Sequence, residues 1–192
     1  MSRENLSPAR LEAFSDGVIA VIITIMVLEL KVPAQDGLAG VRAVMPTVFL
    51  YLLTFVQVGI YWVNHHYLVD ETKTVSHGVL WANLFFLFFL SLFPFVTLWI
   101  GAKGLTHFST ALYAVASLLP GVCYAVLATQ IRKQSTSPPH STTGKQNTSI
   151  VLYLLAIPAA YWRPAASMTL IAIVSLLWLL PPRVEESDVR AG

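Results

Sequence analysis

The sequence predicts an all-α integral membrane protein, a bundle of six transmembrane helices. Of the 192 residues, 56% are apolar and only 11% are charged, and the mean hydropathy is +0.67. A soluble domain carries roughly 25% charged residues, and one this short has too little interior to bury so much apolar surface. The apolar residues also gather in segments close to the ~20 residues that a helix needs to cross the hydrocarbon core.

Short polar stretches separate the six apolar segments. The fifth segment is short and contains Pro158, and only Trp162, Arg163 and Pro164 separate it from the sixth, so these two are predicted to form a tight helical hairpin. The stretch 134–147, rich in Ser, Thr, Pro and Lys, is predicted to be a flexible linker. The predicted helices are 11–30, 43–66, 80–100, 108–131, 149–162 and 164–181, in one membrane domain, 1–182, that a polar tail, 183–192, follows.

The distribution of Lys and Arg predicts that both termini are cytoplasmic. With a cytoplasmic amino terminus and six crossings, eight basic residues lie inside and four outside, in agreement with the positive-inside rule. No cleavable signal peptide is predicted, so we expect a multi-pass protein of the cell membrane. The inside group is Arg3, Arg10, Lys73, Arg132, Lys133, Lys145, Arg183 and Arg190, and the outside group is Lys31, Arg42, Lys103 and Arg163.

Composition and motifs exclude several partners and cofactors. The net charge of +2 is too small for a nucleic-acid-binding surface, which needs clustered Lys and Arg. The single cysteine, Cys123, permits neither an intrachain disulfide nor a Cys-based zinc site. No nucleophile, metal or cofactor motif accompanies the histidines, so we expect no enzyme activity, no cofactor and no tightly bound metal.

The first predicted helix contains polar residues that lipid accommodates poorly. Asp16 lies about a turn inside the membrane boundary, where an unpartnered carboxylate costs a few kcal/mol. Its partners must lie at the same depth, at the end of the second segment and the start of the third. We interpret them as a structural hydrogen-bond cluster that joins three helices, and a direct role in gating or proton sensing is the alternative. The residues at this depth are Trp62, Asn64, His65, His66, Trp81 and Asn83.

Four residues at the start of the first helix form a short and unusual signature. Arg10, Phe14, Ser15 and Asp16 are spaced as R-x-x-x-F-S-D. This signature, its apolar continuation over 17–30 and the Trp-x-Asn-His run at 62–65 resemble the transmembrane protein 175 family of potassium channels. The resemblance implies a bacterial-type subunit of six helices that assembles as a homotetramer around a central pore. It also implies that the first helix lines this pore.

A helical wheel places Val21, Ile25 and Leu28 on one stripe of the first helix, with Thr24 at its border and Asp16 on another face. The resemblance implies that the stripe forms the pore constriction and that Thr24 lies beside the ion pathway. The residues alone leave the alternative that the stripe packs against another helix.

Two polar residues of this helix also have two interpretations each. The Thr24 hydroxyl either faces the ions or donates to the carbonyl of Ala20. Glu29 either raises the cation concentration at the outer pore mouth or reaches water beside Lys31.

The resemblance implies a potassium-selective cation channel, with potassium ions, membrane lipid and other copies of the chain as partners. The sequence contains no Thr-Val-Gly-Tyr-Gly filter, so any potassium selectivity must arise another way. Rings of apolar side chains can hold a pore dry and favour potassium, which sheds water more easily than sodium. A secondary transporter or a membrane scaffold protein is the alternative, although the two halves of the chain show no convincing similarity of the kind that transporter repeats have.

Overall fold

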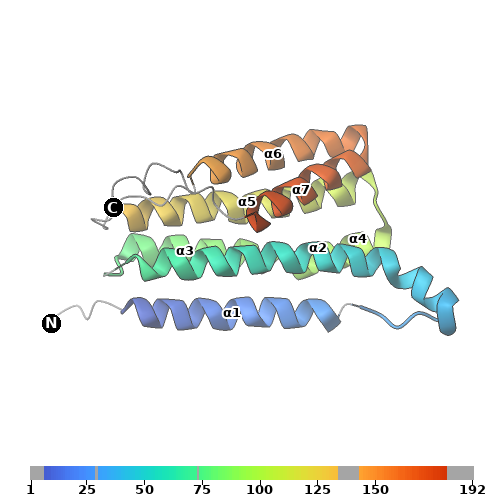
Figure 1. The fold of residues 1–192 in the computed structure, drawn as a ribbon, viewed down its shortest axis with the longest axis horizontal. Helices are drawn as coiled ribbons and strands as arrows, with labels where there is room; N and C mark the ends of the chain where they lie inside the picture. The colour runs from blue at the N-terminus through green and yellow to red at the C-terminus, as the bar shows by residue number, and fades with distance from the viewer. Residues whose placement is uncertain (1–6, 29, 73, 134–142, 181–192) are drawn as a thin grey trace, which may run out of the picture.

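A computed structural model describes residues 7–28, 30–72, 74–133 and 143–180 of the chain. Every helix or strand found in these ranges is an α-helix, which confirms the predicted all-α class. Figure 1 shows the helices lying side by side with roughly parallel axes. The helices are α1 (Pro8–Leu28), α2 (Gly37–Asp70), α3 (His77–Leu90), α4 (Phe93–Lys103), α5 (His107–Arg132), α6 (Thr143–Trp162) and α7 (Pro164–Leu179).

Four stretches of this part of the chain are long and apolar enough to cross a membrane: α1, α2, α3 together with α4, and α5. Several helices extend beyond the predicted apolar segments. α2 begins at Gly37, whose φ of 70° suits glycine and whose amide donates to the Asp36 carboxylate at 2.7 Å. α6 begins at Thr143, inside the predicted linker, so the polar end of that linker forms the first turns of the helix.

The third apolar segment, predicted as one helix over 80–100, consists of two helices. α3 ends at Leu90 and α4 begins at Phe93, with Pro94 in its first turn. Proline lacks an N–H group, and in a continuous helix its ring would clash with the carbonyl of residue 90. The Ser91 hydroxyl donates to the Phe88 carbonyl at 2.7 Å beside this break.

α6 and α7 form the predicted tight hairpin. α6 ends at Trp162 and α7 begins at Pro164, so Arg163 alone makes the turn, with an extended backbone at φ −149° and ψ 112°. Proline suits the first position of a helix because the amide there has no intrahelical acceptor. His107 Nδ1 lies 2.9 Å from the Ala160 carbonyl oxygen and ties the start of α5 to the end of α6.

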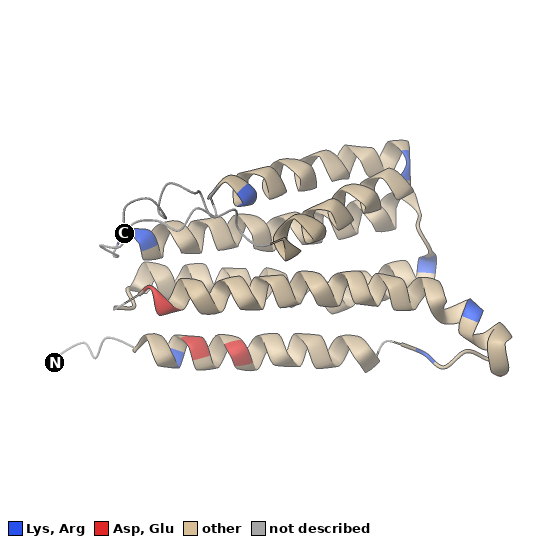
Figure 2. Cartoon of the chain, viewed as in Figure 1, with Lys and Arg blue, Asp and Glu red and all other residues tan. Residues whose placement is uncertain are grey.

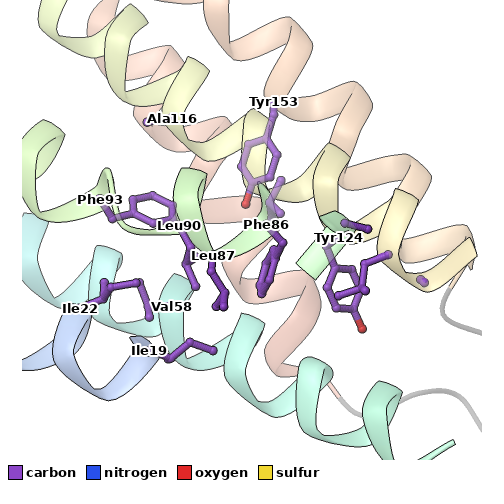
Figure 3. Close-up of a cluster of buried hydrophobic side chains, with 14 of the residues drawn as sticks. Ile19, Ile22, Val58, Phe86, Leu87, Leu90, Phe93, Ala116, Tyr124 and Tyr153 are labelled. Carbon is purple, nitrogen blue, oxygen red and sulfur yellow. The ribbon is translucent and has the colours of Figure 1, made fainter. Parts of the chain in front are cut away.

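α5 is the central helix and packs on α3, α4, α6 and α7. Small residues on its buried faces, including Ala114 and Ala128, let neighbouring helices approach closely. Large side chains fill the remaining space. Figure 3 shows Ile19, Val58 and Phe86, from α1, α2 and α3, gathered in one core, and all three are buried.

One buried hydroxyl joins three helices in this core. Thr54 of α2 donates to the Leu50 carbonyl at 3.0 Å, so its oxygen accepts the hydroxyl protons of Thr97 of α4, at 3.0 Å, and Tyr113 of α5, at 2.8 Å. A hydroxyl has one proton and two lone pairs, and all of them are used here.

Charged side chains lie at the two ends of the bundle, and its middle has none among the described residues (Figure 2). Arg10, Arg132 and Lys145 lie at the start of α1, the end of α5 and the start of α6, whereas Arg42 lies near the start of α2 and Lys103 at the end of α4. These are members of the two groups that the sequence analysis assigned to opposite sides of the membrane, and the fold separates them.

Replacing Thr54 with valine should lower the free energy of unfolding by about 1–3 kcal/mol, because the Tyr113 and Thr97 hydroxyls lose their shared buried acceptor. Thr129→Val is the matched control, since the Thr129 hydroxyl is exposed and donates only to the Ala125 carbonyl of its own helix. Chemical denaturation of the protein in detergent, followed by tryptophan fluorescence, measures both changes. Equal effects of the two substitutions would contradict a stabilising role for the Thr54 hydrogen bonds.

Candidate functional site: the first helix and its polar cluster

α1 lies at one edge of the bundle and packs on α2, α3 and α4 (Figure 1). The residues that face these helices recur every three or four positions, which is the spacing of one helix face. They are Leu11, Ser15, Ile19, Ile22 and Met26, and all are buried. The opposite face of α1 is not covered by the described part of the chain.

A series of three hydrogen bonds joins α2, α3 and α1. His65 Nε2 lies 2.8 Å from Asn83 Oδ1, Asn83 Nδ2 donates to Ser15 Oγ at 2.9 Å, and Ser15 Oγ donates to the Leu11 carbonyl at 2.9 Å. Because the single Ser15 proton is given to Leu11, its oxygen must accept from the Asn83 amide. Asn83 then presents its oxygen to His65, so His65 Nε2 is the donor.

This chain of hydrogen bonds is completely enclosed. Ser15, His65 and Asn83 each have 0% of their surface exposed. The His65 ring stacks on Phe86, with ring centroids 5.7 Å apart and an angle of 8° between the planes. Packing and hydrogen bonding together fix the depth and the rotation of α1 against α2 and α3.

Two further contacts join α1 to α2 nearer the solvent. Trp62 Nε1 donates to Asp16 Oδ1 at 2.9 Å, and His66 Nδ1 lies 2.7 Å from Glu12 Oε1. Glu12 is not among the residues predicted for this cluster. Its position four residues before Asp16, on the same face of a helix, is the signal that could have identified it.

Asn64 lies outside this cluster, so its predicted place in the network is wrong. The Asn64 side-chain amide donates to the Ile60 backbone carbonyl at 2.7 Å, and the Asn64 backbone carbonyl accepts from the Tyr124 hydroxyl at 2.9 Å. The reason is helical geometry, because residue 64 projects about 100° away from His65 and faces α5.

Three other residues at this end of the bundle also take no part in the buried hydrogen-bond series. Arg10 and Phe14 of the signature are exposed. The Trp81 indole donates to His77 at 3.1 Å and not to α1.

The stripe of Val21, Ile25 and Leu28 is on the uncovered face of α1, with exposed fractions of 54%, 43% and 78%. No helix of the described residues covers this stripe. Thr24 is also exposed, and its hydroxyl donates to the Val21 carbonyl at 3.0 Å and not to that of Ala20. Glu29 lies outside the described residues.

A wide groove of about 860 Å³ runs beside this stripe, between α1 and α4. Val21 and Ile25 form part of one wall, and Phe95 and Leu98 form part of the other. The lining is mostly apolar, so the groove suits hydrocarbon, either lipid or protein.

Comparison with known proteins identifies the family. The model of the family described as endosomal/lysosomal potassium channel TMEM175 matches residues 10–94. A potassium channel of Chryseobacterium sp. (strain P1-3) is 39% identical over 189 residues, which cover 95% of this chain and 98% of the relative. The chain belongs to the TMEM175 family. A potassium channel of Streptomyces collinus is 31% identical over 126 residues, which cover 62% of this chain and 61% of that protein.

A solved structure shares the fold. It is the crystal structure of a TMEM175 homologue from Chamaesiphon minutus, described as a lysosomal potassium-selective channel homologue. The TM-score is 0.78 and the identity is 24%, and the match covers 90% of this chain and 96% of the other. The arrangement of helices is therefore that of TMEM175 proteins.

The family assignment confirms the resemblance that the R-x-x-x-F-S-D signature indicated. TMEM175 is a family of channels and not of enzymes. The matched region, 10–94, extends from α1 to the first turn of α4. It includes all three side chains of the buried hydrogen-bond chain, Ser15, His65 and Asn83.

Replacing Ser15 with alanine should lower the free energy of unfolding by about 1–3 kcal/mol, because the buried Asn83 amide loses its acceptor. Thr169→Val is the control, since the Thr169 hydroxyl is exposed and donates to the Ala165 carbonyl of its own helix. Asp16→Ala should lower the free energy of unfolding less than Ser15→Ala does, because Trp62 is 45% exposed and its indole can find another acceptor. Thermal unfolding in detergent ranks the three variants, and a larger loss for Asp16→Ala would contradict this order.

Proposed function

We propose that the protein is a potassium-selective channel of the cell membrane, a homotetramer with a central pore lined by α1. The observation that carries the proposal is the division of α1 into two faces. One face is fixed to α2, α3 and α4 by the buried polar chain, and the other is apolar and uncovered at the edge of the bundle. The relatives named as potassium channels support potassium as the permeating ion.

A single pore-lining helix per subunit cannot enclose a pathway, so several copies must surround an axis with closed symmetry. In such an assembly each exposed position of the stripe repeats around the axis as a ring. Val21, Ile25 and Leu28 would then form three successive constrictions, each about one turn from the next. The groove beside α1 would be covered by the neighbouring copy, whose apolar surface suits its lining.

Apolar rings account for selectivity without a carbonyl filter. They hold a narrow pore free of water, and a cation must lose part of its hydration shell to pass. Potassium sheds water more easily than the smaller sodium ion, so it is favoured. The Thr24 hydroxyl gives its proton to the Val21 carbonyl, so its lone pairs are left to replace some of the lost water. Glu29 would increase the cation concentration at the outer mouth.

We also propose six membrane crossings within a channel domain, 1–182, with both termini cytoplasmic. α6 has 20 residues, but its first turns are polar, and α7 has 16 residues, or about 24 Å, so the apolar part of each is shorter than a full span. A short helix is accommodated by local thinning of the bilayer or by flanking polar residues that reach the interface. The segregation of basic residues to two ends of the bundle supports this topology (Figure 2).

Purified protein in liposomes should conduct potassium passively, and asparagine at the narrowest ring should raise conductance and lower selectivity. The polar side chain keeps water in the constriction, so the barrier falls for every cation. The variants are Val21→Asn, Ile25→Asn and Leu28→Asn, each tested for its potassium to sodium permeability ratio.

Val151→Asn is the matched control for these variants, since Val151 of α6 is apolar and as exposed as Val21, at 54%. It should leave the ratio unchanged. If the tetramer stays intact and no stripe variant alters conduction, α1 does not line the pore. Flux that requires a second ion would indicate a transporter, and absence of flux a scaffold.

Cysteines at positions 38 and 133 should react with an impermeant maleimide from opposite sides of the membrane. Leu38 lies at the start of α2 and Lys133 just after α5, and both are exposed. In a Cys123→Ser background, intact cells should label Leu38→Cys alone, and permeabilised cells should label both variants. Labelling of both variants in intact cells would overturn the proposed topology.

A further inference from the structure

A small polar cavity lies inside the subunit, between α2, α5, α6 and α7, on the other side of the bundle core from the exposed face of α1. Its volume is about 30 Å³. The polar residues that line it include Gln57 and Tyr61 of α2 and Gln146, Ser149 and Tyr153 of α6. Buried polar groups need hydrogen-bond partners, because lipid supplies none.

Two glutamine side chains in the lining lack partners. Gln57 is 2% exposed and Gln146 is 7% exposed, and the Nε2 atom of each is buried with no hydrogen bond to the described residues. Ser117 Oγ lies 3.3 Å from the other end of the Gln57 amide. Whichever way this amide is turned, one of its polar atoms is left without a partner. Each such atom costs free energy unless the cavity contains something that binds it.

α2 and α6 both pack on α5, and residues of all three helices line the cavity. Within the described ranges, no side-chain hydrogen bond joins α2 to α6. The Tyr61 hydroxyl lies beside Gly121 of α5, where a Cβ atom would stand 3.1 Å from it. Glycine at this position therefore keeps space open for the hydroxyl and for the cavity.

We propose that this cavity is a water-binding site in which ordered water binds the unpartnered amides of Gln57 and Gln146. The volume holds roughly two water molecules, and a buried water typically makes two to four hydrogen bonds. Water can accept from an amide N–H and donate to a tyrosine or serine oxygen. A cation cannot accept from N–H, and no acidic residue stands among the described lining residues to neutralise it. An organic ligand is too large.

Hydroxyl-radical footprinting of the intact protein in nanodiscs tests the proposal, because radiolysis of bound water modifies the side chains beside it. Tyr153 lines the cavity and is 4% exposed, and Tyr113 is 0% exposed and lies outside the cavity lining. We expect Tyr153 to be modified several-fold faster than Tyr113. Equal rates would overturn the proposal, and this comparison needs no variant.

A pair of glycine variants tests whether the modification depends on the cavity. Gly121→Ala places a methyl group against the Tyr61 hydroxyl and should reduce Tyr153 modification toward the rate of Tyr113. Gly59→Ala is the control, since a Cβ there meets nothing within 4 Å, and it should leave the rate unchanged. Unchanged modification in Gly121→Ala would contradict a site at this position.

Crystals soaked in thallous ions distinguish water from a cation. An anomalous peak between Gln57 and Gln146 would show a cation site and overturn the proposal. Density for water within hydrogen-bond distance of each amide, without an anomalous peak, is the expected result.

Discussion

The buried hydrogen-bond chain from His65 through Asn83 and Ser15 to the Leu11 carbonyl holds α1 in place, and the arrangement of the other surfaces follows from it. Apolar contact alone discriminates weakly between positions of a membrane helix, because lipid tails are as apolar as the neighbouring helices. A polar group without a partner is costly in lipid, so the rotation and depth of α1 that form these hydrogen bonds are favoured. That rotation turns the face of Val21 and Ile25 away from its own bundle.

A second buried hydrogen-bonded group joins helices in the subunit core. Thr54 collects hydrogen bonds from α4 and α5 through one oxygen, and small residues of α5 let the surrounding helices approach. The polar contacts specify which helices meet, and the aromatic side chains around Phe86 fill the space between them (Figure 3). α1 joins this core only through its buried face, which is consistent with a helix that serves both the subunit and an assembly.

Much of the fold could be predicted from the sequence because lipid imposes a simple length rule. The helical class, the α6–α7 hairpin and the depth of the polar residues all follow from apolar segments and their interruptions. Asn64 shows the limit. The pattern places it near the end of α2, but the face it occupies depends on where α5 packs, which no local pattern reveals. Proline chemistry alone does not predict the break at Pro94, because Pro46, Pro120 and Pro158 lie inside continuous helices. The cavity lined by Gln57 and Gln146 depends on helices that are distant in sequence.

The direction of the buried chain has an electrical consequence. A proton can hop along hydrogen-bonded groups only if each one can accept a proton on one side and release another on the opposite side. The Asn83 carboxamide would have to become an imidic acid to do so, and the series ends at a peptide carbonyl that passes nothing on. The polar residues that hold α1 are therefore linked by hydrogen bonds but do not form a path for protons. They can cross between three helices inside the membrane without offering protons a leak through the subunit.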